Sequence, residues 1–566
     1  MKRGLTIVAG ILLLAACASA QDQSSASWRE DLDYLVRRIE IMHPNPFGFF
    51  PREDFHRLKE KLADEIRRLS EADIVIAISG LLANLQDGHT RVGFEQSDPE
   101  WLNRSFHLLP FILYPFKDGV HILAGIAPHQ DLVGARVVKI GQLPVGEAVR
   151  RLGRLYSHDN ASGEKKSLYY TLGFAEMLKG IGAIDSVERI ALTLRTRRGK
   201  EVRREIGTVP FIAMAMYLGT WYPQAGNGLA TMNDGAANPL PLWLKDRERK
   251  FWFEYLPQER MMFLQINSLD FPHGEGHEEG SFGQSCARFF EALDQSGAEK
   301  LVIDIRANNG GNHVELPLLK GIIARPLIDR HDRLFLVTGR VTYSAAVHFT
   351  TVFRKYTQAT VIGEETAGRP NHYGSFRKFA LPNHPQVVIG CSVDYYQDSE
   401  PFDFNTTHNP DIVTRMTAAD YCDNIDPALA AVRNYDRTCR KARALAQELA
   451  KEYGAGGCDG MKRLYQANRR NLLDSGYNLE KFFGELVDNR FPANKNGTAE
   501  YIDFLAFACG ECPESIDLCY ALAARLEAGG RIAEAKKHYA RCLQLNPECH
   551  YAKMRLGLLD LSEKNL

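Results

Sequence analysis

The sequence predicts an α/β protein whose central region is a largely parallel β-sheet, with helical regions before and after it. Three patterns support this class. Strand-like and helix-like segments alternate over residues 251–415, apolar residues recur every three or four positions over residues 26–86, and the chain from about residue 436 has a helical pattern. Alternation of this kind is typical of parallel strands joined by helices.

The N-terminal region, residues 26–100, is expected to be a helical bundle. "SWREDLDYLVRRIEIMH" and "REDFHRLKEKLADEIRRL" are amphipathic, and "SEADIVIAISGLLANLQ" starts with the capping pattern Ser70 to Asp73. The third helix should end at "DGHT", where Gly88 interrupts the pattern. Residues 101–250 read as a mixed β region that contains a hairpin with the turn "RRGK".

The central region, residues 251–415, carries the residues of most chemical interest. "EKLVIDIRANNGGN" reads as a buried strand that ends in a glycine turn, where backbone N–H groups can face a ligand. "RLFLVTG" is the next strand, and a helical pattern begins after Ser344. A serine at this junction has two interpretations: it caps the helix, or it is a nucleophile with backbone donors beside it.

Composition narrows the function classes. The 566 residues are 45% apolar and 25% charged, with a formal net charge of -1. These are ordinary globular values, and they give no electrostatic reason to expect a nucleic-acid partner.

The first 20 residues are interpreted as an export signal, because a basic "MKR" precedes a short apolar stretch. Two cleavage sites compete. "LAAC" resembles a bacterial lipobox, which would make Cys17 the lipidated N-terminus, whereas "ASA" before Gln21 suits ordinary signal peptidase. We therefore expect an exported bacterial protein, either an outer-membrane lipoprotein with a lipid anchor or a periplasmic protein.

Several motifs together resemble the S41 peptidase family, which includes C-terminal processing (tail-specific) proteases and tricorn-core proteases. They are "DGHT", then "DIRANNGG", then Ser-Ala-Ala at a strand–helix junction, "IGEETAGRP" and "NPDI". The resemblance covers roughly residues 28–415. It implies a ClpP/crotonase-like catalytic core, a peptide or protein substrate and no cofactor or catalytic metal. A partial match of "DLVGARVVKIGQLPVGEAV" to PDZ segments implies a PDZ-like part within 101–250.

The resemblance also implies roles for particular residues. Ser344 would be the nucleophile, and the oxyanion hole would be formed by Gly310, Gly311 and the N–H of Ala345. Processing proteases use a lysine base in a T-x-G-K motif, but this chain has Arg369 there, and arginine stays protonated. The tricorn branch uses a histidine, which corresponds to His89.

Alternatives remain open around this base. His348, one helical turn after Ser344, is a rival. A histidine base needs an orienting group, and the tricorn enzyme's serine at that place is Gly88 here, so Asp87, Glu400 and Asp403 are the candidate carboxylates. Arg369 would bind a substrate carboxylate or form an ion pair with Glu364 or Glu365.

The tail, residues 436–566, resembles tetratricopeptide repeats (TPR) over "YALAARLEAGGRIAEAKKHYARCLQLNP", which implies a protein partner or docking on the core. Eight cysteines fall between Cys422 and Cys549. In an exported protein they favour disulfides, with free buried thiols or a metal site built on "CGEC" as alternatives.

Together, the export signal and the resemblance to S41 peptidases predict an exported serine peptidase, with a non-catalytic binding protein of the same fold as the alternative.

Overall fold

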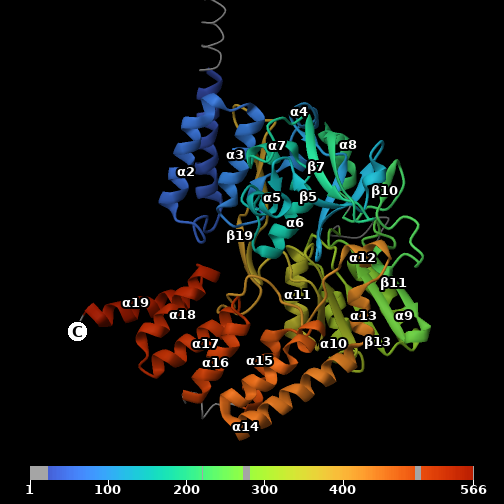
Figure 1. Ribbon diagram of the computed structural model, residues 1–566, viewed down its shortest axis with the longest axis vertical. Helices are drawn as coiled ribbons and strands as arrows, with labels where there is room; N and C mark the ends of the chain where they lie inside the picture. The colour runs from blue at the N-terminus through green and yellow to red at the C-terminus, as the bar shows by residue number, and fades with distance from the viewer. Residues whose placement is uncertain (1–22, 220, 272–280, 491–498, 565–566) are drawn as a thin grey trace, which may run out of the picture. The chain divides into compact units, whose positions relative to one another are not determined.

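The computed structural model describes residues 23–219, 221–271, 281–490 and 499–564 (Figure 1). The predicted signal segment 1–20 and Cys17 lie outside these residues. The chain divides into two compact units. The first comprises the chain up to Asp159 with Ser167–Asp234 and Tyr373–Tyr396, and the second comprises Asn160–Lys166, Gly235–His372 and the chain from Gln397 onward.

The first unit begins with three helices: a helix over 23–42, α2 (Arg52–Glu65) and α3 (Glu71–Ala83). The predicted cap of α3 is confirmed, because the Ser70 hydroxyl accepts a hydrogen bond of 3.2 Å from the Asp73 N–H. Shorter helices follow: α4 (Pro99–Ser105), α5 (Val145–Leu152), α7 (Ala175–Gly180) and α8 (Phe211–Leu218).

Its main sheet is antiparallel, with strand order β10-β4-β5-β7-β8, β3 beside β4 and β6 beside β5. The predicted hairpin is confirmed as β7–β8. A smaller sheet has the order β1-β18-β17, and β2 pairs with β9. The strands are β1 (Arg91–Val92), β2 (His107–Leu108), β3 (Phe111–Phe116), β4 (Gly119–Ile126), β5 (Arg136–Ile140), β6 (Leu143–Pro144), β7 (Arg189–Arg195), β8 (Glu201–Gly207), β9 (Val209–Pro210), β10 (Leu229–Thr231), β17 (Arg377–Ala380) and β18 (Val388–Cys391).

The second unit is built on a six-stranded sheet of order β11-β12-β13-β14-β15-β20. Only the β11–β12 pair is antiparallel, so the predicted largely parallel layer is confirmed. The strands are β11 (Phe251–Leu256), β12 (Met261–Ile266), β13 (Lys300–Asp304), β14 (Leu334–Thr338), β15 (Thr360–Gly363) and β20 (Ile412–Val413). Helices α9 (Phe282–Ser296), α10 (Leu316–Ile323) and α11 (Ala345–Tyr356) connect the parallel strands.

Alternate residues of these strands enter two separate cores. Met262, Leu264 and Ile303 pack with α9, α10 and α11 on one face. Phe263 and Val302 face the other way, into a core shared with the C-terminal helices. Because successive side chains of a strand point to opposite faces, apolar residues at every position require cover on both sides of the sheet.

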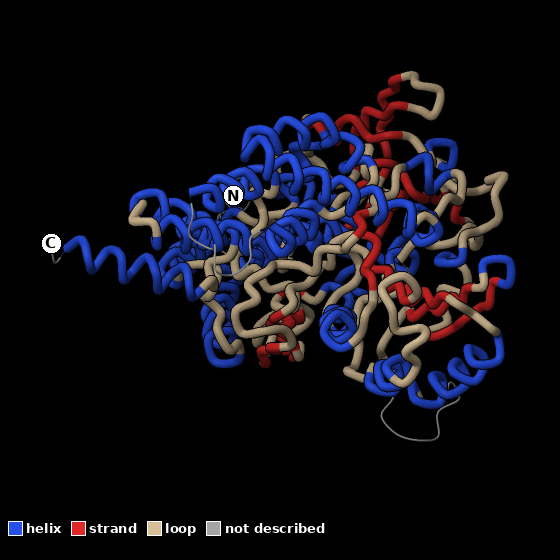
Figure 2. Tube along the Cα trace, turned by 90° about the horizontal axis from the view of Figure 1, so that it is seen from below, coloured by secondary structure: helices blue, strands red, loops and turns tan. Residues whose placement is uncertain are grey.

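The C-terminal helices provide the second cover. They are α12 (Ala418–Cys422), α13 (Pro427–Arg433), α14 (Tyr435–Asp474, broken at Gly457), α15 (Leu479–Arg490), α16 (Ala499–Glu511), α17 (Ile516–Ala528), α18 (Ile532–Leu545) and α19 (His550–Lys564). Figures 1 and 2 show this tail as a series of helices. One apolar core runs from β12 to α19, so the tail docks on the sheet rather than forming a separate body.

Three further elements, α6 (Ala161–Thr171), β16 (Asn371–Gly374) and β19 (Asp394–Gln397), lie where the chain passes from one unit to the other. Within the described part of the chain, no helix is both long and apolar enough to cross a membrane.

The tail disulfides expected from the cysteine count are not formed. All ten cysteines of the described residues are free thiols. Cys519 and Cys542 are fully buried on inward faces of helices, where a thiol packs as a small apolar side chain. The sulfurs of Cys509 and Cys519 are 3.5 Å apart, well beyond the roughly 2 Å of a disulfide bond.

Candidate active site

Ser344 lies immediately before α11, after β14 has ended at Thr338. Its backbone has φ 55° and ψ -128°, a conformation that residues with a side chain rarely adopt. Holding it costs about 1–3 kcal/mol, which the surrounding structure must supply. The side chain makes no helix-capping hydrogen bond. The capping interpretation is therefore wrong, and a strained serine between a strand and a helix is typical of a raised nucleophile.

The glycine turn of "DIRANNGG" packs directly against this serine. Gly310 has φ 105°, and a Cβ added to it would lie 2.9 Å from the Cβ of Ser344 and 3.1 Å from the N of Ala345. Gly311 has φ 138°, and a Cβ there would meet the backbone of Leu269 and Asp270 at 2.3 Å. Only glycine suits either position, so the turn is fixed beside the start of α11.

The backbone donors of this turn differ from the expectation in one respect. The N–H of Gly310 donates to Asn308 Oδ1 at 2.8 Å, so it already has a partner. Among the described residues, no acceptor is found for the N–H of Gly311 or of Ala345. Ala345 is the first residue of α11, where N–H groups have no partner within the helix. Gly311 and Ala345 are therefore the donors available for an oxyanion.

A buried ion triad anchors the strand that leads into the turn. Arg306 Nε is 2.9 Å from Asp304 Oδ2, and its two terminal nitrogens lie 2.8 and 2.9 Å from the carboxylate oxygens of Asp426. All three side chains are buried. Removing one partner of such a group would leave an unpaired buried charge, which would lower the free energy of unfolding by about 3–5 kcal/mol. The triad thus ties the end of β13 to the start of α13.

Lys166 is a neighbour of the site that the sequence did not suggest. Its Nζ is 2.5 Å from Asn309 Oδ1 and 3.8 Å from the centre of the Tyr343 ring. The lysine therefore contacts both the glycine turn and the residue before Ser344.

His348, the rival base, is held between two carboxylates. Its Nε2 is 3.1 Å from Glu315 Oε1, its Nδ1 is 2.9 Å from Asp398 Oδ1, and its ring stacks on His313 with centroids 4.0 Å apart. Burial disfavours the charged ring, but Asp398 and Glu315 outweigh it and raise the pKa of His348 to about 9. At neutral pH this imidazole is protonated, so it is a poor acceptor for a serine proton.

His89 belongs to the first unit, in the loop between α3 and β1. The loop is organised by Asp87, which is 2% exposed. This carboxylate accepts hydrogen bonds from the His89 N–H at 3.0 Å, Thr90 Oγ1 at 2.5 Å and Ser392 Oγ at 2.6 Å, and it lies 3.1 Å from His43 Nε2. The His89 Nδ1 atom is 3.8 Å from Asp87 Oδ1.

These contacts define the charge of the loop. Burial opposes ionisation of Asp87, but the hydrogen bond and the charge of His43, followed by the charge of His89, hold the pKa of this carboxyl well below its ordinary value. Asp87 is therefore a carboxylate at neutral pH, and it stands beside the predicted base.

The other two candidate carboxylates have local partners. Glu400 forms an ion pair of 3.0 Å with Lys355, and both side chains are substantially exposed. Asp403 accepts hydrogen bonds from Ser399 Oγ at 2.6 Å and from the Asn405 N–H at 3.1 Å. Both stabilise the loop before "NPDI". Asp87 is the candidate carboxylate that lies next to His89, with Asp87 Oδ1 3.8 Å from His89 Nδ1.

Arg369 is 5% exposed. The two carboxylates expected as its partners pair elsewhere: Glu364 Oε2 accepts a hydrogen bond of 2.9 Å from Arg340 Nε, and Glu365 pairs with Arg415. Each of the two glutamates therefore has another arginine as a partner.

The comparisons with known proteins agree with this architecture. The sequence matches no protein-family model and no curated protein. Among solved structures, a serine-to-alanine mutant of CPAF aligns over 72% of this chain and 98% of its own, with a TM-score of 0.51 and 13% identity. Mature CPAF aligns over 74% and 98%, with a TM-score of 0.50 and 14% identity.

The photosystem II D1 C-terminal processing protease aligns over 68% of this chain and 92% of its own, with a TM-score of 0.31 and 14% identity. The likeness to the two CPAF structures, at 13% and 14% identity, defines the fold alone. The chain shares the fold of these structures, and the predicted fold class, an α/β core with an all-helical C-terminal region, is confirmed.

Proposed function

We propose that this chain is an exported serine peptidase in which Ser344 forms an acyl-enzyme and His89 is the general base. One observation carries the proposal: a strained Ser344 is packed against a glycine turn, beside the available N–H groups of Gly311 and Ala345. A serine that only stabilised the helix would not need this backbone conformation.

The chemistry follows from these groups. His89 takes the proton of Ser344 Oγ as the oxygen attacks the peptide carbonyl carbon, and it returns that proton to the departing amine. The Gly311 and Ala345 donors stabilise the oxyanion of the tetrahedral intermediate, each by about 3 kcal/mol. Water then attacks the acyl ester with His89 again as the base, which releases the acid product and restores Ser344.

Two alternatives for the base are weaker. Arg369 occupies the position of the processing-protease lysine but cannot lose its proton at working pH. His348 is held protonated by Glu315 and Asp398. Asp87 supports His89 by fixing its loop through the main-chain hydrogen bond, with Thr90, Ser392 and His43 completing the network.

Labelling with a fluorophosphonate tests the nucleophile. The probe should modify native protein at Ser344, identified by mass spectrometry, and should not modify Ser344→Ala. Ser281→Ala is the matched control, because Ser281 is a helix-capping serine of the same unit. Absence of labelling and of peptide hydrolysis in folded protein, with peptide binding retained, would instead support a non-catalytic binding protein.

For localisation, we propose an outer-membrane lipoprotein anchored through Cys17, supported by "LAAC" after a basic start. Radiolabelled palmitate should enter the wild-type protein and not Cys17→Ala. An unlabelled mature protein that begins at Gln21 would contradict the lipid anchor and leave a periplasmic protein.

For the tail, we propose that the TPR-like helices also bind a protein. Support comes from α19, which exposes Tyr551, Met554, Leu558 and Leu561 at a spacing that places them on one side of the helix. Analytical ultracentrifugation of the wild type and Leu558→Glu tests a second copy of the chain as the partner. A wild type that stays monomeric at high concentration would contradict self-association.

A further inference from the structure

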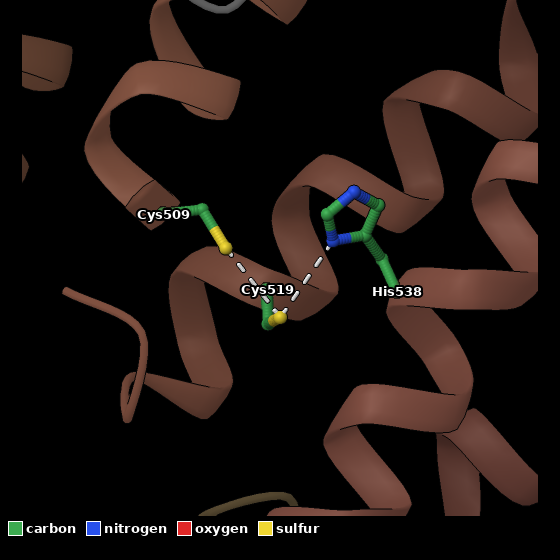
Figure 3. A group of neighbouring side chains, drawn as sticks. All are labelled: Cys509, Cys519 and His538. Carbon is green, nitrogen blue, oxygen red and sulfur yellow. Dashed lines mark hydrogen bonds between the residues drawn. The ribbon is translucent and has the colours of Figure 1, made fainter. Parts of the chain in front are cut away.

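Three side chains with metal-binding atoms converge in the tail, away from the groups used above. They are Cys509 of α16, Cys519 of α17 and His538 of α18 (Figure 3). The Cys509 and Cys519 sulfurs are 3.5 Å apart, and Cys519 Sγ is 3.8 Å from His538 Nδ1. Figure 3 shows the two sulfurs and the ring nitrogen pointing toward a common centre between the helices.

These separations match the edges of a tetrahedral metal site. With metal–sulfur bonds of about 2.3 Å and metal–nitrogen bonds of about 2.0–2.1 Å, a tetrahedral ion holds two sulfurs about 3.8 Å apart and a sulfur and a nitrogen about 3.6 Å apart. Two of the three observed distances lie within a few tenths of an ångström of these values, and the Cys509 sulfur and the His538 ring nitrogen lie within 4.8 Å of each other. An ion could therefore be held after small movements of these side chains.

The surroundings also suit such an ion. Cys509 is 8% exposed and Cys519 is 1% exposed, whereas His538 is half-buried. Two sulfurs and one imidazole form a soft ligand set, which selects Zn²⁺ or Cu⁺ over Mg²⁺ or Ca²⁺.

We propose that Cys509, Cys519 and His538 form a binding site for one soft metal ion, Zn²⁺ or Cu⁺, which joins three successive helices of the tail. Binding releases the two thiol protons, so each sulfur coordinates as a thiolate and His538 coordinates as a neutral ring. A water or an added ligand completes the coordination of Zn²⁺, while Cu⁺ is satisfied by the three protein ligands.

The site differs from the one suggested by the C-x-x-C spacing. "CGEC" pairs Cys509 with Cys512 in sequence, but the metal-ligating atoms that come together in space are those of Cys519 and His538. This makes Cys512→Ser a close matched control: it removes the neighbouring thiol of the same motif and leaves the three proposed ligands in place.

The test uses the full chain, fully reduced and freed of metal. One titration uses Zn²⁺ in competition with a chromophoric chelator, and a second, anaerobic titration uses Cu⁺ in competition with a Cu⁺ chelator. We expect each titration to give a stoichiometry of one bound ion per chain. Because raw affinity does not decide which metal a site holds, the metal is identified as the ion present in protein isolated from cells, by elemental analysis. Co²⁺ in place of Zn²⁺ should give the thiolate charge-transfer absorption and tetrahedral d–d bands of an S₂N site.

Cys519→Ser and His538→Gln should lower affinity by more than about 100-fold, since loss even of an outer partner weakens metal sites 10–100-fold. Cys512→Ser should bind as the wild type does. Because Cys519 is fully buried, His538→Gln at the half-buried position is the variant to rely on if Cys519→Ser fails to fold.

Three outcomes would overturn the proposal: no stoichiometric ion in the reduced protein, wild-type affinity in folded His538→Gln, or a Cys509–Cys519 disulfide in the protein as isolated from cells. Fluorophosphonate labelling of Ser344 should be unchanged in His538→Gln. Failure of the metal-site proposal is therefore distinguishable from failure of the peptidase proposal.

Discussion

A methyl group on Gly310 would lie 2.9 Å from the Cβ of Ser344, closer than real Cβ atoms approach one another. The glycine turn and the strained serine are therefore built as one rigid feature. A substitution at Gly310 should therefore alter the position of Ser344. This contact is a suitable position for a mutational test of the site.

Gly310→Ala should damage the site without touching Ser344 itself. The new methyl group would meet Ser344 Cβ and Tyr343 O, both at 2.9 Å, from a backbone with φ 105°. We expect fluorophosphonate labelling to slow by more than about tenfold and stability to fall by about 1–3 kcal/mol. Gly235→Ala is the control, because Gly235 also has positive φ (73°) but nothing within 4 Å. Equal labelling rates in the two variants would contradict the proposed rigidity.

Asp87→Asn should weaken both the loop and the activity. The substitution removes the charge beside His43 and disturbs the acceptors used by Thr90, Ser392 and the His89 N–H. Loss of a buried charged partner should lower the free energy of unfolding by about 3 kcal/mol or more. Peptide hydrolysis should fall by more than about tenfold, because His89 loses its positioning.

Ser392→Ala removes one hydrogen bond of the same network and is the graded control. It should lower stability by about 1 kcal/mol and leave hydrolysis close to wild type. If Asp87→Asn folds and hydrolyses peptide at the wild-type rate, Asp87 does not position the base.

His348 should stabilise the protein in acid and neutral solution and not in alkali. Its folded-state pKa of about 9 lies above the ordinary value of 6.5, so its contribution is complete below pH 6.5 and is lost as pH rises through 9. Allowing for solvent screening, the contribution is about 1–2 kcal/mol. Urea unfolding of the wild type and His348→Gln should therefore give a stability difference that shrinks between about pH 6 and pH 10. The exposed His331→Gln is the control, and a constant difference for His348→Gln would contradict the ion pairs.

His408 should behave in the opposite way. Burial, and then the charges of Arg354 and His372, lower the pKa of His408 to about 3, and its Nε2 is 2.7 Å from Thr351 Oγ1. The folded protein keeps this ring neutral while the unfolded chain takes up a proton below pH 6.5, so stability is lost as pH falls from there towards 3. Relative to His408→Gln, the wild type should lose up to about 1.4 kcal/mol per pH unit in this range. Parallel pH profiles from urea unfolding would show that His408 is not buried and neutral.

The sequence anticipated the features that local patterns encode. The alternation over 251–415 predicted the parallel layer because apolar periods of two and of 3.6 residues are properties of single elements. The glycine turn and Ser344 were each found from a local pattern: two glycines follow the end of β13, and Ser344 lies between the end of β14 and the start of α11. The same holds for the cap of α3 at Ser70.

The partners that complete the site could not be found in this way. Ser392 reaches Asp87 across 305 residues, Asp426 reaches Arg306 across 120, and Lys166 reaches Asn309 across 143. No local pattern marks either end of such a pair. The cysteines illustrate the same limit: their count favoured disulfides, but only the helix packing determines which sulfurs meet and at what distance.

The most direct measurement is kcat/KM for one peptide substrate in wild type, His89→Ala, Ser344→Ala and the double variant. Because groups that act as a unit are non-additive, each single substitution should lower kcat/KM by about 10³-fold or more, and the double variant should be no worse than the poorer single one. Arg369→Ala should keep measurable turnover, since arginine is not the base. The account is contradicted if His89→Ala stays within about tenfold of the wild type while Lys166→Met abolishes hydrolysis, because the proton of Ser344 would then be taken by the lysine beside the glycine turn.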